Sequence, residues 1–170
     1  ANTKPGNFDG LNSYSAQALA AVGISSGNPV VFNNITFTWP NIAAGLQNNY
    51  KAQGQVIPVT PVTGATTLAF LGSSTSGPSS GTATITYTDA TTQTFTLGLS
   101  DWTLGGGSKQ PSFGNQVVAT TAYRNTQLGP QTASKPVVLY TDVALQAGKT
   151  VKSVTLPVNS QLHVFTIATK

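Results

Sequence analysis

The stretch GTATITYTDATTQTFTLGLSDW, residues 81–102, decides the fold. Residues 82–88 alternate Thr with Ala, Ile and Tyr, and residues 94–99 alternate Thr and Gly with Phe and Leu. A strict period of two places the two sets of side chains on opposite faces of a strand, so the stretch predicts two half-buried strands. Asp89 and Ala90 supply the turn between them. The length of this hairpin and its β-branched and aromatic content are typical of strands inside a sheet.

On both sides of this hairpin, short apolar runs alternate with segments rich in Gly, Pro, Ser and Asn. The runs that predict strands are 29–39 (a second hairpin that turns at Asn33-Asn34), 55–59, 66–71, 116–123, 136–145, 151–157 and 162–169. Residues 13–22 predict the one helix, because apolar residues recur at helical spacing between Ser13, a good N-cap, and Gly23. Residues 162–169 are apolar at both alternating sets of positions, which predicts a strand buried on both faces.

About ten short strands with one short N-terminal helix predict an all-β fold, a two-sheet antiparallel β-sandwich. No shift in composition marks a boundary, so we interpret residues 1–170 as a single β-sandwich domain. Because the sequence contains no Met, even at position 1, we interpret it as a domain excised or processed from a larger secreted polypeptide. No run of about 18 apolar residues is present, so no membrane span is predicted.

The composition excludes several classes of protein. Charged residues make up 7% of the chain, against about 25% in an average soluble protein, and neutral polar residues take their place. Because only four carboxylates titrate in the acid range, the surface charge changes little as the pH falls, which favours an extracellular setting. Cysteine is absent, so disulfides and thiol chemistry are excluded. The lysines are scattered along the chain, whereas nucleic-acid binding usually needs a clustered basic face.

Catalytic chemistry has few candidate residues in this chain. Hydrolysis of glycosides usually uses a pair of carboxylates, but the carboxylates here are isolated in the sequence, at Asp9, Asp89, Asp101 and Asp142. His163, the single histidine, lies within a predicted buried strand, and the chain contains no G-x-S-x-G motif. One His without any Cys does not make a zinc site. The sequence therefore predicts no catalytic residue and a protein that is not an enzyme.

Aromatic residues at the ends of predicted strands are the candidate ligand-binding residues. Sugar recognition uses aromatic faces flanked by amide, hydroxyl or guanidinium groups, and loops at the ends of a sandwich are where binding residues gather. The candidates are Trp39, Tyr50, Trp102, Tyr123, Arg124 and Asn125. The alternative for the two tryptophans is a role as plugs of the sandwich core, and the alternative for Arg124 is an ion pair with Asp101.

Five stretches carry a resemblance to a known domain family. They are FDGLNSYSAQALAAVGI (8–24), ITFTWPNIAAG (35–45), LAFLGSSTSGPSSGTATITYTDATTQTFTLGLSDW (68–102), TAYRN (121–125) and GKTVKSVTLPVNSQLHVFTIAT (148–169). Together they resemble an accessory β-domain found beside catalytic modules in secreted actinobacterial glycoside hydrolases. The closing pair of strands is also similar to the end of galactose-binding-like jelly rolls. The resemblance implies a jelly-roll sandwich.

The same resemblance implies a function. It is that of a non-catalytic, carbohydrate-binding accessory module, whose partners are a glycan or polysaccharide and the neighbouring catalytic module. The alternative is a purely structural or protein-interaction sandwich that binds no sugar. No cofactor is required, but jelly rolls of this type often carry a structural calcium near the start of the chain. Asp9, among Asn side chains and backbone carbonyls, is the candidate ligand, and its alternative role is to cap the local turn or the start of the helix.

Overall fold

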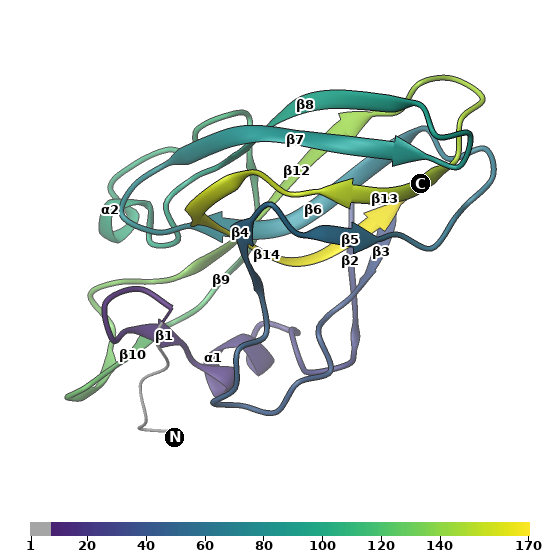
Figure 1. Ribbon diagram of the computed structural model, residues 1–170. Helices are drawn as coiled ribbons and strands as arrows, with labels where there is room; N and C mark the ends of the chain where they lie inside the picture. The colour runs from purple at the N-terminus through teal and green to yellow at the C-terminus, as the bar shows by residue number, and fades with distance from the viewer. Residues whose placement is uncertain (1–7) are drawn as a thin grey trace.

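The computed structural model describes residues 8–170, which form an antiparallel β-sandwich, as predicted (Figure 1). The larger sheet has five strands in the order β4 (Tyr50–Gln53), β14 (Val158–Thr169), β6 (Thr67–Ser74), β12 (Val137–Ala144) and β9 (Gln116–Thr120). The smaller sheet has four strands in the order β5 (Val56–Pro58), β13 (Val151–Thr155), β7 (Ser79–Tyr87) and β8 (Thr92–Leu99). Every neighbouring pair in both sheets is antiparallel.

The hairpin predicted from residues 81–102 is confirmed as β7 and β8. Ala83 lies opposite Phe95 and Thr82 opposite Thr96, so like faces meet across the pair. Ala83, Ile85 and Tyr87 point into the sandwich and are at most 1% exposed. The turn places Ala90 at a φ of 67°, a left-handed conformation of the kind that closes tight hairpins.

The two larger hydrophobic cores among the described residues lie on opposite faces of the five-stranded sheet. The first fills the space between the sheets and includes Leu68, Phe70, Leu162 and Val164. The second lies on the far face, where β6 and β14 contribute residues such as Leu71 and Phe165. The prediction that residues 162–169 are buried on both faces is therefore confirmed for 162–165, whereas 166–169 are only half-buried.

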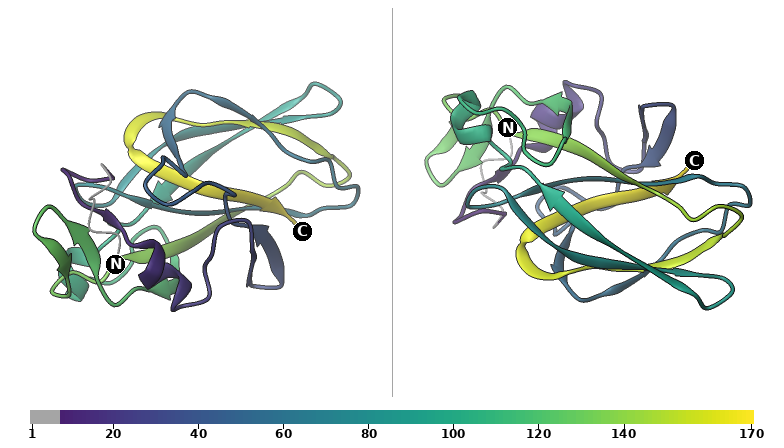
Figure 2. Two further views of the ribbon diagram at one scale, coloured as in Figure 1. Left: turned by 90° about the horizontal axis from the view of Figure 1, so that it is seen from below. Right: turned by 90° about the horizontal axis from the view of Figure 1, so that it is seen from above.

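An N-terminal layer covers the far face of the five-stranded sheet (Figure 2). It consists of α1 (Ala16–Ala20) and the hairpin of β2 (Pro29–Phe32) and β3 (Ile35–Thr38), which confirms the second predicted hairpin. Asn33 and Asn34 take positive φ values of 49° and 59° at its turn. These elements bury Leu19, Val30 and Phe37 in the second core, and Trp39, directly after β3, is buried with them.

The predicted helix is displaced and shortened. Its N-cap is Ser15 rather than Ser13, and the Ser15 Oγ accepts a hydrogen bond from the Ala18 N–H at 3.3 Å. Ser13 and Tyr14 instead form strand β1, because their backbone pairs with a distant segment that has no local sequence signal. That segment and the next give a small sheet in the order β1 (Ser13–Tyr14), β10 (Arg124–Thr126) and β11 (Gly129–Gln131), where the sequence predicted a loop.

The Gly-rich connection after β8 forms one helical turn, α2 (Leu104–Gly107), in which Gly105 and Gly106 have left-handed φ values of 61° and 73°. Among residues 8–170, no helix is long and apolar enough to cross a membrane.

Candidate ligand-binding groove

Both tryptophans of the predicted binding set lie in the interior. Trp39 is 2% exposed and stacks on Phe165, with ring centroids 4.6 Å apart. Trp102 is 1% exposed, and its Nε1–H donates to the Asp9 Oδ2 at 2.9 Å. Both indoles therefore pack as parts of the core, and Trp39 also lines part of the second cavity described below.

Three further candidate residues lie beside residues 13–15, and one of them contacts Trp102. The Arg124 guanidinium carbon lies 5.8 Å from the centre of the indole ring, a cation–π contact. The Ser15 hydroxyl donates to the Tyr123 hydroxyl at 3.1 Å. Asn125 is 3% exposed, and its Oδ1 has no hydrogen-bond partner among the described residues. The structure therefore brings Tyr123, Arg124 and Asn125 together beside residues 13–15, with Arg124 also against Trp102.

Arg124 does not pair with Asp101, which corrects that alternative. The Arg124 Nε–H donates to the Gln131 Oε1 at 2.7 Å. Asp101 accepts instead from the Thr103 N–H and hydroxyl, at 2.8 and 2.7 Å, and from the Gly77 N–H at 3.0 Å. Burial raises the pKa of the Asp101 carboxyl, but these hydrogen bonds outweigh it and hold the pKa below its usual value.

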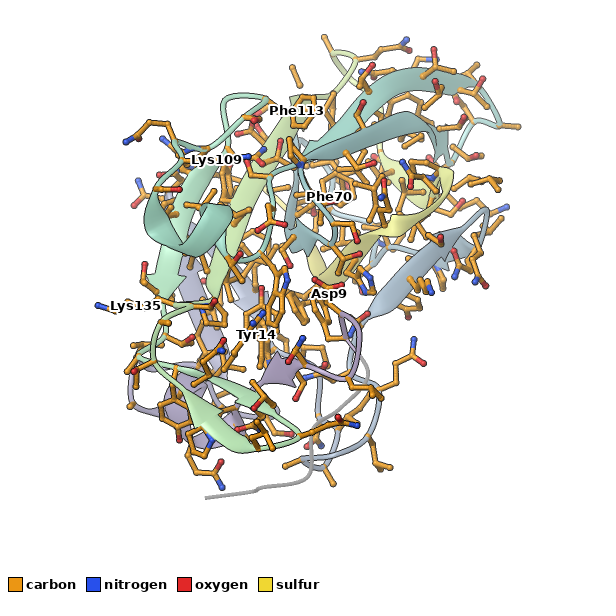
Figure 3. The ribbon with its side chains drawn as sticks, turned by 90° about the vertical axis from the view of Figure 1, so that its left-hand side faces the viewer. Asp9, Tyr14, Phe70, Lys109, Phe113 and Lys135 are labelled. Atoms are coloured by element: carbon orange, nitrogen blue, oxygen red, sulfur yellow. The ribbon has the colours of Figure 1, made fainter. Side chains whose placement is uncertain are left out.

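Asp9 is tied to the interior as well as to its own turn. Beyond its bond to Trp102, its backbone exchanges hydrogen bonds with Asn12 at 3.0–3.1 Å. Asp9 and Tyr14 lie near one another in Figure 3, and both contact Trp102. Among the described residues, no three His, Cys, Asp or Glu gather into a metal-binding group. A structural calcium bound by Asp9, with Asn and carbonyl oxygens, stays a prediction.

His163 links β14 to the segment before β4. Its Nδ1 lies 2.8 Å from the Asn49 Oδ1, and its ring centroid lies 4.3 Å from that of Phe8. Burial, followed by the nearby positive charge of Lys51, lowers the pKa of His163 to about 4, although Asp9 opposes this. The imidazole is therefore neutral at pH 7. Because an amide oxygen only accepts, Nδ1 carries the proton and donates it to Asn49.

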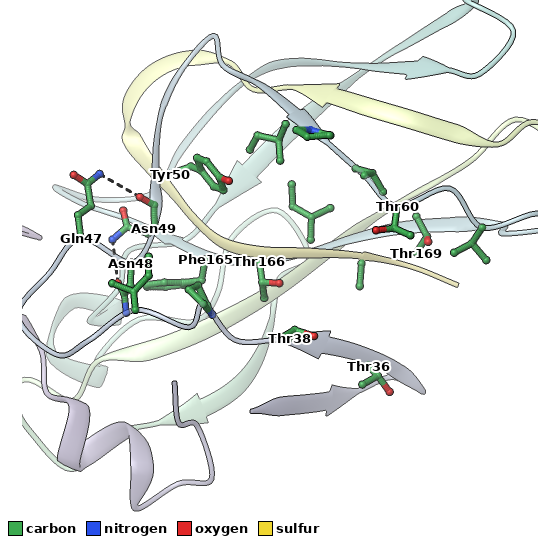
Figure 4. Close-up of a pocket in the computed structure, with 18 residues that line it drawn as sticks. Thr36, Thr38, Gln47, Asn48, Asn49, Tyr50, Thr60, Phe165, Thr166 and Thr169 are labelled. Carbon is green, nitrogen blue, oxygen red and sulfur yellow. Dashed lines mark hydrogen bonds between the residues drawn. The ribbon is translucent and has the colours of Figure 1, made fainter. Parts of the chain in front are cut away.

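A groove beside the C-terminal half of β14 is the open site that the sequence did not predict (Figure 4). We call it the β14 groove, and its volume is about 730 Å³. One wall carries Thr36 and Thr38 of β3, the opposite wall is residues 57–60 with Val62, and the floor is residues 165–169. Tyr50, one of the predicted site residues, stands at one end and is 45% exposed. Of the described residues that line the groove, none carries a charge.

The groove exists because β4 is shorter than the strand it pairs with. Tyr50 lies opposite Val164 and Lys51 opposite His163, and the pairing goes no further toward the end of β14. Residues 47–49, which precede β4, turn aside and line the groove instead of continuing the ladder. β14 then runs on to Thr169 with β6 on one side and the groove on the other.

Local sequence patterns explain which residues of each wall are exposed. They do not explain why the two walls lie opposite each other. In β3 the alternation of ITFT buries Ile35 and Phe37, so Thr36 and Thr38 are exposed. In β5 Ile57 is buried, while Val62 beyond it is 43% exposed. A second cavity of about 580 Å³ lies on the other side of residues 42–49 and is lined in part by Trp39, Lys51 and His163.

This arrangement of sheets agrees with one protein family. The family model of the AziU2-like beta-sandwich domain matches residues 1–170. The chain belongs to this family. No curated protein matches the chain. The family name describes a β-sandwich domain, which is the fold seen here, and it says nothing of carbohydrate or of glycoside hydrolases.

Proposed function

We propose that this AziU2-like domain is a non-catalytic binding module and that its ligand places an uncharged, elongated segment in the β14 groove. The observation that carries the proposal is the lining of the groove, in which threonine hydroxyls and Asn or Gln amides face aliphatic side chains without any charged group among the described residues. Ligand sites are typically concave and apolar with a few polar groups that fix orientation. The groove has this character.

A neutral carbohydrate is the ligand that the sequence analysis predicted, and Tyr50 is the residue that favours it. Its ring is exposed, and the amides of Asn48 and Asn49 line the same end of the groove. An aromatic face beside amides and hydroxyls is the chemistry that sugar recognition uses. The buried positions of Trp39 and Trp102 reduce the support for this ligand, because they leave Tyr50 as the exposed aromatic face at the groove, where Phe165 is buried.

The setting that we propose is the one that the resemblance implied. The domain is secreted and lies next to the catalytic module of a larger polypeptide, such as a glycoside hydrolase, and it contributes binding rather than chemistry. The alternative is a protein-interaction domain that uses the same groove. Support for the alternative comes from the core positions of both tryptophans.

Titration of the ¹⁵N-labelled protein with neutral oligosaccharides, such as cellohexaose, xylohexaose and chitohexaose, tests the carbohydrate. We expect amide shifts at Tyr50 and residues 166–169. The variant Tyr50→Ala should bind about five- to tenfold more weakly, since an aromatic contact contributes about 1 kcal/mol. The variant Leu128→Ala is the matched control, because Leu128 is fully exposed outside the groove. No binding at millimolar sugar, with the protein folded, would remove carbohydrate as the ligand.

A further inference from the structure

Resting on the proposed use of the groove, we infer that the ligand is an extended polypeptide segment that adds to the open edge of β14 as a further strand. Strand addition takes affinity from backbone hydrogen bonds and specificity from the side chains that flank the edge. It needs an edge strand with unpaired backbone groups, open space beside it, and walls that accept alternating side chains. The β14 groove has all three.

The register of β14 shows which backbone groups are unpaired. Lys170 and Thr67 exchange two backbone hydrogen bonds, of 3.0 and 2.9 Å, so they form a hydrogen-bonded pair. In an antiparallel ladder such pairs alternate with pairs that do not exchange hydrogen bonds. Ala168 opposite Ala69 is therefore the next bonded pair, and Ile167 and Thr169 direct their N–H and C=O groups away from β6. These groups face the groove, where the ladder to β4 has ended.

The two walls of the groove differ in the side chains that they present, and this difference predicts the order of residue types in the partner segment. Thr36 and Thr38 present hydroxyls from the β3 wall. Ile57, Val59 and Val62 present aliphatic side chains from the opposite wall, where Thr60 adds a hydroxyl. Successive side chains of an added strand point to opposite faces, so the partner should alternate small polar residues with aliphatic ones.

The edge lacks the usual side-chain protection against strand addition, and its one backbone irregularity among the described residues is a bulge between Val164 and Thr166, before Ile167 and Thr169. Proteins commonly protect exposed edges with Lys, Pro or inward-pointing charges. Residues 165–169, FTIAT, include none of these. Positive charge lies just beyond the two ends instead, at Lys51 after Tyr50 and at Lys170 after Thr169, and no acidic residue lines the groove among those described. Acidic residues flanking the neutral segment of the partner would complement these lysines.

The experiment uses the peptide Ac-EVTVTVTVTE-NH₂ and two N-methylated forms, one methylated at every Val and the other at every Thr. Only alternate N–H groups of an added strand face β14, so one N-methylated form should bind at least about tenfold more weakly and the other should bind like the parent. The amide shifts of the ¹⁵N-labelled protein should centre on Ile167 and Thr169. Equal binding by all three peptides, or loss with both N-methylated forms, would overturn strand addition.

A variant pair tests the protein side. Thr169→Pro removes one edge N–H at a position where an edge strand tolerates Pro, and Thr169→Val keeps the N–H while removing the hydroxyl. We expect Thr169→Pro, once circular dichroism confirms its fold, to lose peptide binding and Thr169→Val to retain it. If Thr169→Pro fails to fold, the two N-methylated peptides still decide the question. Cellohexaose bound in the groove without peptide binding would overturn the polypeptide ligand and keep the groove; binding of neither would overturn both.

Discussion

The Nδ1–H of His163 donates to the Asn49 side-chain oxygen at 2.8 Å, and this bond joins β14 to the segment where its neighbour β4 begins. Asn49 also lines the β14 groove. The bond therefore fixes the point at which the ladder between β4 and β14 stops and the groove opens. A buried neutral imidazole at this point makes the stability of the sheet sensitive to acid.

The free energy of unfolding should fall as the pH drops from about 6.5 to about 4. In the folded protein the pKa of His163 is about 4, against 6.5 for the free side chain, so the unfolded chain takes up the proton first. The loss has an upper limit of about 3 kcal/mol and is smaller to the extent that solvent screens the ring. Urea denaturation at several pH values measures it. The variant His163→Gln should be nearly flat over this range, and a wild-type profile equally flat would contradict the prediction.

This acid sensitivity of the folded protein differs from what the amino-acid composition led us to expect. Few titrating carboxylates predict a surface that responds weakly to acid. Asp89 follows that expectation in part, because hydrogen bonds from Thr91 and Lys149 lower its pKa to about 2 and it stays charged until the pH is very low. A single buried histidine is enough to add a pH dependence that a residue count does not contain.

Removing the acceptor of the His163 bond should be costly. Asn49→Ala leaves a buried N–H donor unpaired, so we expect a loss of about 1–3 kcal/mol in the free energy of unfolding. Asn49→Asp keeps an acceptor and adds a negative charge, which should raise the pKa of His163 above 4 in an NMR titration. Unchanged stability of Asn49→Ala would show that the hydrogen bond contributes little.

The Trp102–Asp9 hydrogen bond should also contribute to stability. Trp102→Phe removes the indole N–H and leaves the Asp9 carboxylate without that donor. Together with the lost packing, we expect a cost of about 2–4 kcal/mol in denaturant unfolding. Asp9→Asn, which retains a side-chain oxygen as acceptor, should cost less. A larger loss of stability for Asp9→Asn than for Trp102→Phe would mean that the charge of Asp9 has another partner.

The same variant tests the calcium site that the resemblance implied. If Asp9 is a ligand, calcium should raise the melting temperature of the chelator-treated wild-type protein and not that of Asp9→Asn. A wild-type melting temperature that does not respond to millimolar calcium would remove this site.

Gly72→Ala should be among the most damaging single substitutions. A Cβ at Gly72 would lie 2.4 Å from the His163 carbonyl oxygen and 2.9 Å from a Leu99 methyl group, so the two sheets or β14 must move. We expect a loss of about 3 kcal/mol or more. Gly148→Ala is the control, because a Cβ there meets no atom within 4 Å and only its φ of 75° is unfavourable, at about 1–2 kcal/mol. Equal costs for the two variants would contradict this reasoning.

Local sequence patterns predicted the strands that alternate cleanly. The hairpin of β7 and β8 and that of β2 and β3 are confirmed because period-two alternation and turn residues act over a few positions. The start of the helix was misplaced, because the pairing of Ser13 with Asn125 joins residues more than a hundred positions apart. Local patterns also did not predict the small sheet of β1, β10 and β11, because it depends on pairing between distant residues. From its composition, the segment that contains β10 and β11 was predicted to be a loop.

For the site, the sequence identified residue types but not their exposure. Strand-end tryptophans are compatible with either a binding face or a core, and only packing against Phe165 and Asp9 decided for the core. Of the predicted residues, Tyr50 alone lines the β14 groove. The alternating threonines of the ITFT segment were the available sequence signal for the groove. Nothing in the local sequence, however, places them opposite β14.

The sequence by itself therefore determined a two-sheet antiparallel sandwich of neutral surface, because alternation and composition are properties of short segments. Tertiary structure decided which face of β14 is covered, where β4 stops pairing, and that Ile167 and Thr169 present backbone groups to an open groove. Those outcomes depend on the relative lengths and registers of strands distant in the chain. No local pattern of residues encodes them.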